Sequence, residues 1–286
     1  MLSKEAIQRR VTRMRRSGLL ENKHDEGNAP VVRIAETVEE YCQAFSLVQA
    51  EYHKIGYIPP HPSNMYYNIW SLLPTTNVLI AKADSTIIST VAMIAESEEF
   101  SLPMDGEYRK EVDVIRNKGR RTIVEVGANV TTSSQRWYNA PILMFRGIYH
   151  YCKIAGVTDL VIVINPKHVR FFSEIMMFEI IGEERTYRRM NLPGVAMHCD
   201  MTTYDDLLRQ GYAGTDPSSN LYAFYWNFDA ASLAYMSRVL NNTGRTPRLD
   251  SVDVFVENRP EIFDEFSEKQ VALFESFYNS EEKAVA

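Results

Sequence analysis

Residues 125–183 read EVGANVTTSSQRWYNAPILMFRGIYHYCKIAGVTDLVIVINPKHVRFFSEIMMFEIIGE, and their pattern decides the fold. The stretch begins inside a β-type segment, residues 122–130, which is rich in valine and isoleucine and is interrupted by Gly127. A glycine inside a strand usually marks a bulge or a place where another backbone comes close. The sequence therefore predicts an irregular strand at Gly127, unless this glycine serves packing alone.

A helix and a second strand follow this segment. Asn139 is placed to cap a helix whose Pro141 lies in the first turn, and Gly156 is placed to end it. Residues 158–164 form a nearly continuous β-branched run, which is typical of a strand buried on both faces. The order strand, helix, strand predicts two parallel neighbours joined by a right-handed crossover.

Further periodic segments lie on the N-terminal side of this unit. They predict strands at 31–34, 77–83 and 86–95, the last two forming a hairpin, and helices starting at Thr37 and at residue 107. The whole pattern predicts an α/β (α+β) fold in which helices flank a mixed sheet.

The chain divides into three parts by composition. Residues 1–30 form a basic arm and linker, residues 31–204 form the core domain, and residues 205–286 form a helical C-terminal extension with helices near 229–240 and 262–278. The extension carries fourteen Asp/Glu against seven Lys/Arg. This acidic, helical composition predicts an appendage and not a second catalytic domain.

The three cysteines, Cys42, Cys152 and Cys199, show no metal-ligand spacing and predict neither a disulfide framework nor a metal site. No apolar stretch approaches the roughly 18 residues needed to span a bilayer, and residues 1–23 lack the apolar segment of a secretory signal. We therefore expect a cytoplasmic protein.

The N-terminal arm is strongly basic. Residues 1–23 hold seven Lys/Arg against two Glu, a net charge of +5, and the total of −6 leaves −11 for the remainder. Ile7, Val11 and Met14 follow helical spacing, so the arm predicts a basic amphipathic helix whose partner is anionic lipid or an acidic protein. The alternative is a frayed, solvated terminus. The acidic body shows no basic stripe interleaved with aromatics, which argues against nucleic acid.

Residues 31–201 resemble the GNAT acyltransferase superfamily, and within it the long-chain N-acyl amino acid synthases (FeeM-type), relatives of the acyl-homoserine lactone autoinducer synthases. The resemblance rests on the shared order and spacing of several short segments, because each motif alone is weak. The family-like segments are 52–57, 102–105, Tyr108 and Glu111, 119–121, 125–127, 165–168, Phe171, Phe172, Phe178, Gly182 and 191–193.

The resemblance implies a GNAT-like sheet splayed at its centre and a catalytic site on it. Glu125 matches the strand carboxylate that acts as general base in many members, and it would need a raised proton affinity for that role. The alternative is a structural ion pair with Arg120 or Arg121.

The resemblance also assigns residues that bind the pantetheine arm of the acyl donor. Strand residues would pair with its amides, and the turn before the next helix would hold its phosphate at backbone N–H groups. These residues are Val126, Gly127, Ala128, Asn129 and Val130 on the strand, Gln135, Arg136, Trp137, Tyr138 and Asn139 in the turn, and Asn165 and Phe172 beyond it.

Three departures from the family pattern bear on the acyl donor, on the leaving thiolate and on the product. Tyr138 stands where most coenzyme A users have a glycine, which favours the single phosphate of carrier-protein-bound phosphopantetheine, unless the loop binds no thioester. Phe172 stands where many members have a tyrosine that protonates the leaving thiolate, but thiolates leave readily without a proton. Ala128 stands where the autoinducer synthases have an arginine, which argues against a homoserine-lactone product.

Candidates for the acceptor or the acyl groove are Tyr57, His168 and Arg185. Arg185, Arg188 and Arg189 could hold an amino acid carboxylate, although alternating surface charges would look the same. His168 equally fits a structural role at the start of a helix. Tyr57 belongs to a group of aromatics that line an acyl groove or simply pack the core, namely Phe45, Tyr52, Tyr57 and Tyr66.

The sequence thus leads to the hypothesis of an N-acyltransferase that moves a long-chain fatty acyl group from acyl carrier protein to the amine of an amino acid. No tightly bound cofactor or metal is expected; acyl-phosphopantetheine is the donor substrate. One alternative is an acyltransferase of a secretion or exopolysaccharide system. Another is an inactive scaffold that binds acyl carrier protein or a membrane surface through the basic arm.

Overall fold

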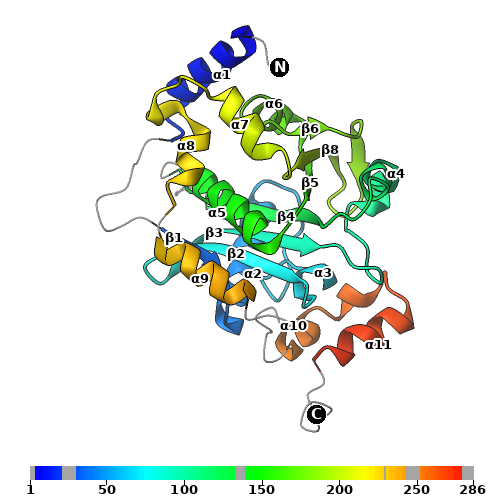
Figure 1. The fold of residues 1–286 in the computed structure, drawn as a ribbon. Helices are drawn as coiled ribbons and strands as arrows, with labels where there is room; N and C mark the ends of the chain where they lie inside the picture. Colours follow the sequence, from blue (N-terminus) through cyan, green and yellow to red (C-terminus); the bar gives the residue numbers. More distant parts are fainter. Residues whose placement is uncertain (1–3, 21–29, 133–138, 229, 242–251, 279–286) are drawn as a thin grey trace.

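The computed structural model describes residues 4–20, 30–132, 139–228, 230–241 and 252–278. Its centre is an eight-stranded mixed sheet with the order β1-β2-β3-β4-β5-β8-β6, and β7 pairs with β8 (Figure 1). The strands are β1 (Val31–Ile34), β2 (Thr76–Ala83), β3 (Thr86–Ala95), β4 (Ile123–Thr131), β5 (Asp159–Ile164), β6 (Glu179–Ile180), β7 (Arg185–Tyr187) and β8 (Leu192–Asp200).

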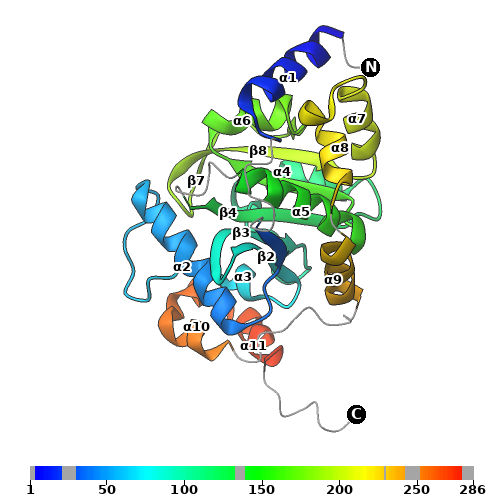
Figure 2. The same ribbon diagram turned by 90° about the vertical axis from the view of Figure 1, so that its left-hand side faces the viewer.

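Helices cover both faces of the sheet, and the sheet separates the apolar interior into two cores (Figure 2). One core lies under α1 (Lys4–Ser17), α5 (Ala140–Ala155), α6 (Pro166–Glu174), α7 (Tyr204–Gly211), α8 (Leu221–Trp226) and α9 (Ala230–Asn241). The other lies under α2 (Val38–Lys54), α3 (Ile69–Leu72), α4 (Asp105–Arg116), α10 (Asp253–Asn258) and α11 (Glu268–Ser276). The predicted α/β fold with a C-terminal helical appendage is confirmed.

Local signals in the sequence act largely as expected. The Thr37 hydroxyl accepts the N–H of Glu40 at 3.2 Å and starts α2, and Gly156 ends α5 in the left-handed conformation at φ +67°. The prediction that the Asn139 side chain caps α5 is wrong. Asn139 occupies the N-cap position, but it takes φ +56° and its side chain makes no capping hydrogen bond.

The irregularity expected at Gly127 lies one residue later. In the β3–β4 register Ala92 faces Gly127 and Thr90 faces Val130, so two residues of β4 stand opposite Val91. This is a β-bulge, and its left-handed residue is Ala128 at φ +47°. A Cβ on Gly127 would meet the tip of Ile94 at 3.3 Å, so the glycine serves close packing beside the bulge.

The crossover β4–α5–β5 makes β4 and β5 parallel, as predicted, but they pair over only three positions. The last pair is Glu125 with Val161, although β4 continues to Thr131 and β5 to Ile164. Beyond this pair β5 bonds only to β8 among the strands, while β4 bonds only to β3. The sheet is therefore splayed at its centre.

A buried charge cluster holds the closed end of this splayed pair. Asp159 is fully buried at the start of β5, and its carboxylate accepts hydrogen bonds from Arg121 at 2.5 and 2.7 Å and is 2.8 Å from the His198 ring. Arg121 also contacts Asp200 at 3.1 Å. Burial raises the pKa of Asp159, but the bonds from His198 and Arg121 outweigh it, so the carboxyl titrates well below its ordinary range.

The basic N-terminal segment forms a docked helix, so the alternative of a frayed terminus is wrong for residues 4–17. Val11 and Met14 are buried against the body, and the guanidinium of Arg10 donates to the backbone oxygen of Glu174 in α6 at 2.5 Å. Arg13 forms an ion pair with the Glu174 side chain. The arm is thus fixed at one end of the molecule.

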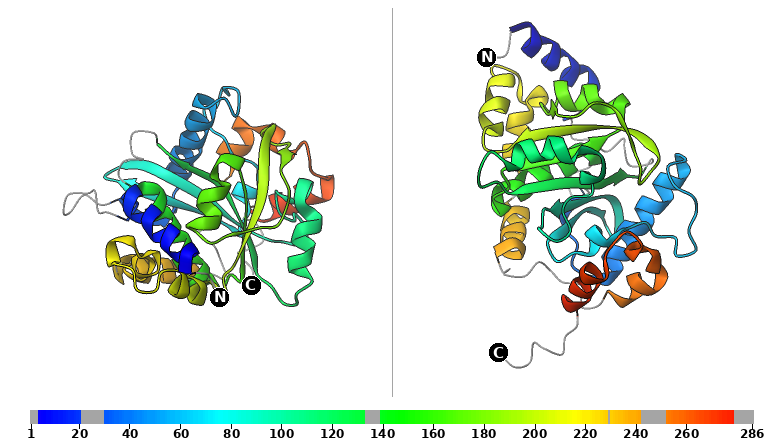
Figure 3. Two further views of the ribbon diagram at one scale, coloured as in Figure 1. Left: turned by 90° about the horizontal axis from the view of Figure 1, so that it is seen from above. Right: turned by 90° about the vertical axis from the view of Figure 1, so that its right-hand side faces the viewer.

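The C-terminal extension wraps around the sheet. α7, α8 and α9 pack on the face covered by α5, whereas α10 and α11 pack on the opposite face beside α2. Figure 3 shows α1 and α11 at opposite ends of the molecule. Within the ranges that the structure describes, no helix combines the length and apolarity that crossing a bilayer requires.

We predict that Asp159→Asn lowers the free energy of unfolding by about 3 kcal/mol, because it leaves Arg121 partly buried with a weakened partner. Urea unfolding followed by circular dichroism measures this as a lower midpoint at unchanged slope. The control is Asp206→Asn, which removes an exposed ion pair with Arg209 and should change stability by less than about 0.5 kcal/mol. Equal effects of the two substitutions would contradict a stabilising role of the cluster.

Candidate active site

The open side of the splayed strands forms the centre of the site. Because β4 and β5 are parallel, their carboxyl ends lie at the same edge of the sheet, and the gap between them widens toward that edge. Gly127, Ala128 and Asn129 are half-buried there, whereas Val126 and Val130 are buried. In the part of the chain that the structure describes, no strand pairs with this edge of β4 beyond Glu125, so an extended molecule could pair with it.

Glu125 lies at the vertex, in the last pair that joins the two strands. Its side chain is 3% exposed, and its Oε2 accepts the backbone N–H of Met104 at 2.9 Å, immediately before α4. The alternative of an ion pair with Arg120 or Arg121 does not hold, since the Arg121 guanidinium binds Asp159 and Asp200, and Arg120 is exposed whereas Glu125 is buried. Glu125 is therefore a buried carboxyl with one backbone donor.

Burial raises the pKa of Glu125 to about 8. The Met104 N–H opposes this shift because it favours the charged form, and Arg189 opposes it by attraction, while Asp105 and Glu107 add to it by repulsion. The carboxyl is thus mostly protonated at neutral pH and ionises just above it. In its ionised form, a carboxylate with such a proton affinity can take up a proton from an amine or from water.

Two further residues interact electrostatically with Glu125: Tyr187, which the sequence analysis did not name, and Arg189, which it named only together with Arg185 and Arg188. Tyr187, on β7, has a pKa raised well above the ordinary value by burial and then by the Glu125 charge. Arg189, in the turn between β7 and β8, acts on both groups. In the sequence, the arginine-rich segment 185–189 indicated this region, but it did not distinguish one arginine from another.

The three arginines of this segment have different surroundings. Arg185 forms an ion pair with Glu111 and lies 4.8 Å above the Tyr108 ring, so α4 holds it. The Arg188 side chain is 86% exposed. Arg189 pairs with Glu265 of the C-terminal extension at 2.7 Å and lies 4.2 Å above the Trp70 ring. Only Arg189 acts electrostatically on Glu125.

The start of α5 lies beyond the open end of β4. The predicted phosphate-turn residues Gln135, Arg136, Trp137 and Tyr138 lie outside the described part of the chain. Asn139 follows them, and its side-chain amide donates to the backbone oxygen of Gly18 at 3.2 Å. This bond places the end of the basic helix α1 beside the N-terminus of α5, where N–H groups favour an anion.

The start of α6 lies beyond the open end of β5. The Asn165 side chain accepts the N–H of Lys167 at 3.2 Å and caps the helix, and His168 is exposed. Phe172 is buried, with its ring centroid 5.5 Å from the rings of Phe145 and Phe178. It packs in the core under α5.

The remaining predicted aromatics lie around α2. Tyr57 is half-buried with its ring 5.7 Å from that of Tyr52, which also contacts Tyr66 at 5.7 Å. Phe45 is buried between Tyr67 and Phe255, at 4.9 and 5.4 Å. Phe45 is thus a core residue, while Tyr66 interacts with Tyr187 and Arg189 near Glu125.

Comparison with known proteins gives one family match and several similar structures. The sequence model of the family described as N-acyl amino acid synthase FeeM matches residues 43–200. A solved structure of FeeM, an N-acyl amino acid synthase from uncultured soil microbes, superposes with a TM-score of 0.57 and 23% identity, over 65% of this chain and 99% of that one. No significant match was found among curated protein sequences.

Two further structures show weaker likeness. The CoA-dependent acyl-homoserine lactone synthase BjaI has a TM-score of 0.48 and 15% identity, over 65% of this chain and 91% of that one. An acyl-CoA N-acyltransferase from Pseudomonas aeruginosa has a TM-score of 0.42 and 15% identity, over 59% of this chain and 99% of that one. At these identities the structural likeness bears on the fold alone.

The raised pKa of Glu125 predicts a pH-dependent stability that Glu125→Gln removes. A carboxyl that holds its proton more tightly when folded stabilises the fold fully below its unfolded pKa, about 4.3, and loses this contribution as pH rises to about 8. Between these values the wild type should lose about 1.4 kcal/mol per pH unit relative to the variant. Urea unfolding of both proteins from pH 5 to 8 measures the difference, and parallel curves would show that Glu125 ionises normally.

Proposed function

Because the chain belongs to the FeeM family of N-acyl amino acid synthases and is therefore an acyltransferase, we propose that it moves a fatty acyl group from acyl carrier protein to the amine of an amino acid. The observation that carries this proposal is Glu125, a buried carboxyl with a pKa of about 8 at the vertex of two splayed strands. The class of reaction, N-acyl transfer, follows from the family.

Starting from the ammonium form of the amino acid, nitrogen must lose two protons while the C–S bond of the thioester is replaced by a C–N bond. The first proton passes to the Glu125 carboxylate, directly or through water, and frees the nitrogen lone pair. The lone pair attacks the thioester carbonyl carbon, the C–N bond forms, the C–S bond breaks and the sulfur leaves as thiolate, while the second proton passes from nitrogen to water. An amino acid is an ammonium ion at neutral pH, so a base of raised proton affinity suits this step.

The open edge of β4 is suited to the donor. The amides of a pantetheine arm can bond to backbone groups of β4 that lack a partner strand, as an added strand does. A backbone N–H near the bulge at Ala128 would then face the thioester oxygen and stabilise the negative charge that develops on it. Phe172 has no proton to give to the thiolate, so the sulfur leaves as an anion.

Two features support a carrier protein as the source of the donor. Tyr138, by sequence, replaces the glycine with which many coenzyme A users accommodate a pyrophosphate. In addition, the contact of Gly18 with Asn139 places α1 beside the start of α5. Arg9 and Arg16 of α1 are exposed, and such charges attract and orient an acidic partner.

We predict that Glu125→Gln lowers acyl transfer by roughly 10²- to 10⁴-fold, the usual contribution of a general base. Formation of acyl amino acid by the purified protein, followed by mass spectrometry, measures the loss. Glu179→Gln, at an exposed glutamate of β6, is the matched control and should retain full activity. Full turnover by the Glu125 variant would remove this residue from the reaction.

For the donor, we predict that the double charge reversal Arg9→Glu/Arg16→Glu raises KM for acyl carrier protein thioesters at least tenfold and leaves KM for acyl-CoA within twofold. The control reversal Lys118→Glu/Lys269→Glu, at exposed lysines outside α1, should change neither constant. Steady-state kinetics with both donors tests this. Equal use of acyl-CoA by the wild type would refute a carrier protein as the specific donor, and carrier binding without turnover would indicate a scaffold.

A further inference from the structure

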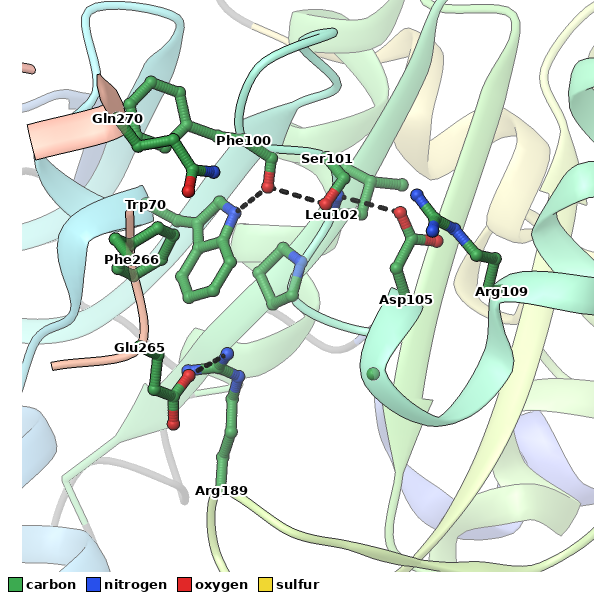
Figure 4. Close-up of a pocket in the computed structure, with 12 residues that line it drawn as sticks. Trp70, Phe100, Ser101, Leu102, Asp105, Arg109, Arg189, Glu265, Phe266 and Gln270 are labelled. Atoms are coloured by element: carbon green, nitrogen blue, oxygen red, sulfur yellow. Dashed lines mark hydrogen bonds and ion pairs between the residues drawn. The ribbon is translucent and has the colours of Figure 1, made fainter. Parts of the chain in front are cut away.

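A cavity of about 280 Å³ lies beside the catalytic segment (Figure 4). Its wall on the core-domain side is formed by Trp70 of α3, by the turn before α4 and by Arg189. The C-terminal extension completes the lining with Glu265, with Phe266, which packs beside Trp70, and with Gln270. The extension lies outside the residues that match the family, so this part of the wall is an addition to the family fold.

The extension is joined firmly to the core at this place. The Phe266 ring packs edge-on against Trp70 with centroids 4.9 Å apart, and the Gln270 amide donates to the backbone oxygen of Glu99 at 2.7 Å. The Ser267 capping box fixes the start of α11 between them. These contacts make the wall a defined surface.

Arg189 connects the cavity with the catalytic carboxyl. Its guanidinium lines the cavity and acts electrostatically on Glu125 and Tyr187. The Met104 N–H that binds Glu125 belongs to the same turn as Asp105, which lines the cavity. A molecule held at Arg189 therefore lies beside the turn whose Met104 N–H binds the base.

The charge of Arg189 suits the carboxylate of an amino acid. Arg189 offers a planar fork that matches a carboxylate, and stacking on Trp70 at 4.2 Å fixes its plane. Its present partner, Glu265, has a side chain that is 64% exposed and can move toward solvent at little cost. Asp105 also lines the cavity, but Arg116 binds its carboxylate at 2.7 Å and neutralises its charge, so Arg189 is the group that attracts an anion.

The size of the cavity favours a small ligand. About 280 Å³ falls just below the range of roughly 300–1,000 Å³ that is usual for ligand pockets, so it fits a molecule of amino-acid size and not a long acyl chain. Aromatic walls formed by Trp70, Phe100 and Phe266 suit an apolar side chain. The thioester arm is expected elsewhere, along β4.

We propose that this cavity binds the acceptor amino acid, that Arg189 binds its carboxylate in exchange for Glu265, and that the C-terminal extension sets which side chain is accepted. This inference rests on the proposed function and adds the acceptor site to it. The extension thereby contributes to the specificity of the enzyme, and Glu265 pairs with Arg189 in the absence of the amino acid.

Binding is tested first without any acyl donor. Isothermal titration of the full-length protein with each of the proteinogenic amino acids should show binding of one or a few of them. Arg189→Gln should weaken that binding at least tenfold, and the matched control Arg188→Gln, at the exposed neighbouring arginine, should leave it within twofold. Binding that is equal in the two variants, or that no amino acid shows, would overturn the proposed cavity whether or not the protein is active.

Kinetics then test the role in the reaction. Arg189→Gln should raise KM for the amino acid at least tenfold and leave KM for the acyl donor within twofold, and Phe266→Ala should shift preference toward larger side chains. Thermal unfolding shows whether each variant is folded. An active wild type whose amino acid KM is insensitive to Arg189 would refute the acceptor site alone, whereas a wild type that binds amino acids through Arg189 but forms no acyl product would refute the proposed function alone.

Discussion

The separation of β4 from β5 after the pair Glu125–Val161 is the constraint on which the rest of the site depends. Among the described residues it leaves this edge of β4 without a partner strand, and a buried backbone group that stays unpaired normally costs free energy. The bulge at Ala128, opposite Val91 of β3, lies on the same stretch of β4. A bound amide chain could form the hydrogen bonds that a partner strand would otherwise form. The opening is therefore suited to binding an extended molecule.

The opening is maintained by what surrounds it. At the closed end, Asp159 with Arg121 and His198 holds the two strands together. At the open end, α5 and α6 begin, and α1 is attached beside them through Gly18. Because helices on both faces bury the vertex, Glu125 is removed from water, and desolvation raises its proton affinity. The packing around the splayed strands thus also raises the pKa of Glu125.

Much of the site could be predicted from the sequence, because its chemistry is carried by local patterns. Gly127 indicated an irregular strand, and the structure places the bulge next to it. Glu125 was identified through the family resemblance, yet its isolation from Arg121 depends on Asp159, which lies 38 residues away from Arg121 in the chain. Likewise, three arginines at 185–189 looked equivalent in sequence, and packing against Glu111, solvent or Trp70 made them different.

The sequence by itself determined strands β1 to β5, the start of α2, the end of α5 and the parallel crossover, since periodicity, caps and glycines act within a few residues of each other. It did not determine where strand pairing stops, how the basic arm docks, or that residues 265–270 approach Trp70. These features depend on contacts between segments far apart in the chain, such as Arg10 with Glu174 and Trp70 with Phe266. Only the tertiary structure brings such groups together, because burial and charge at a point are set by every element packed around it.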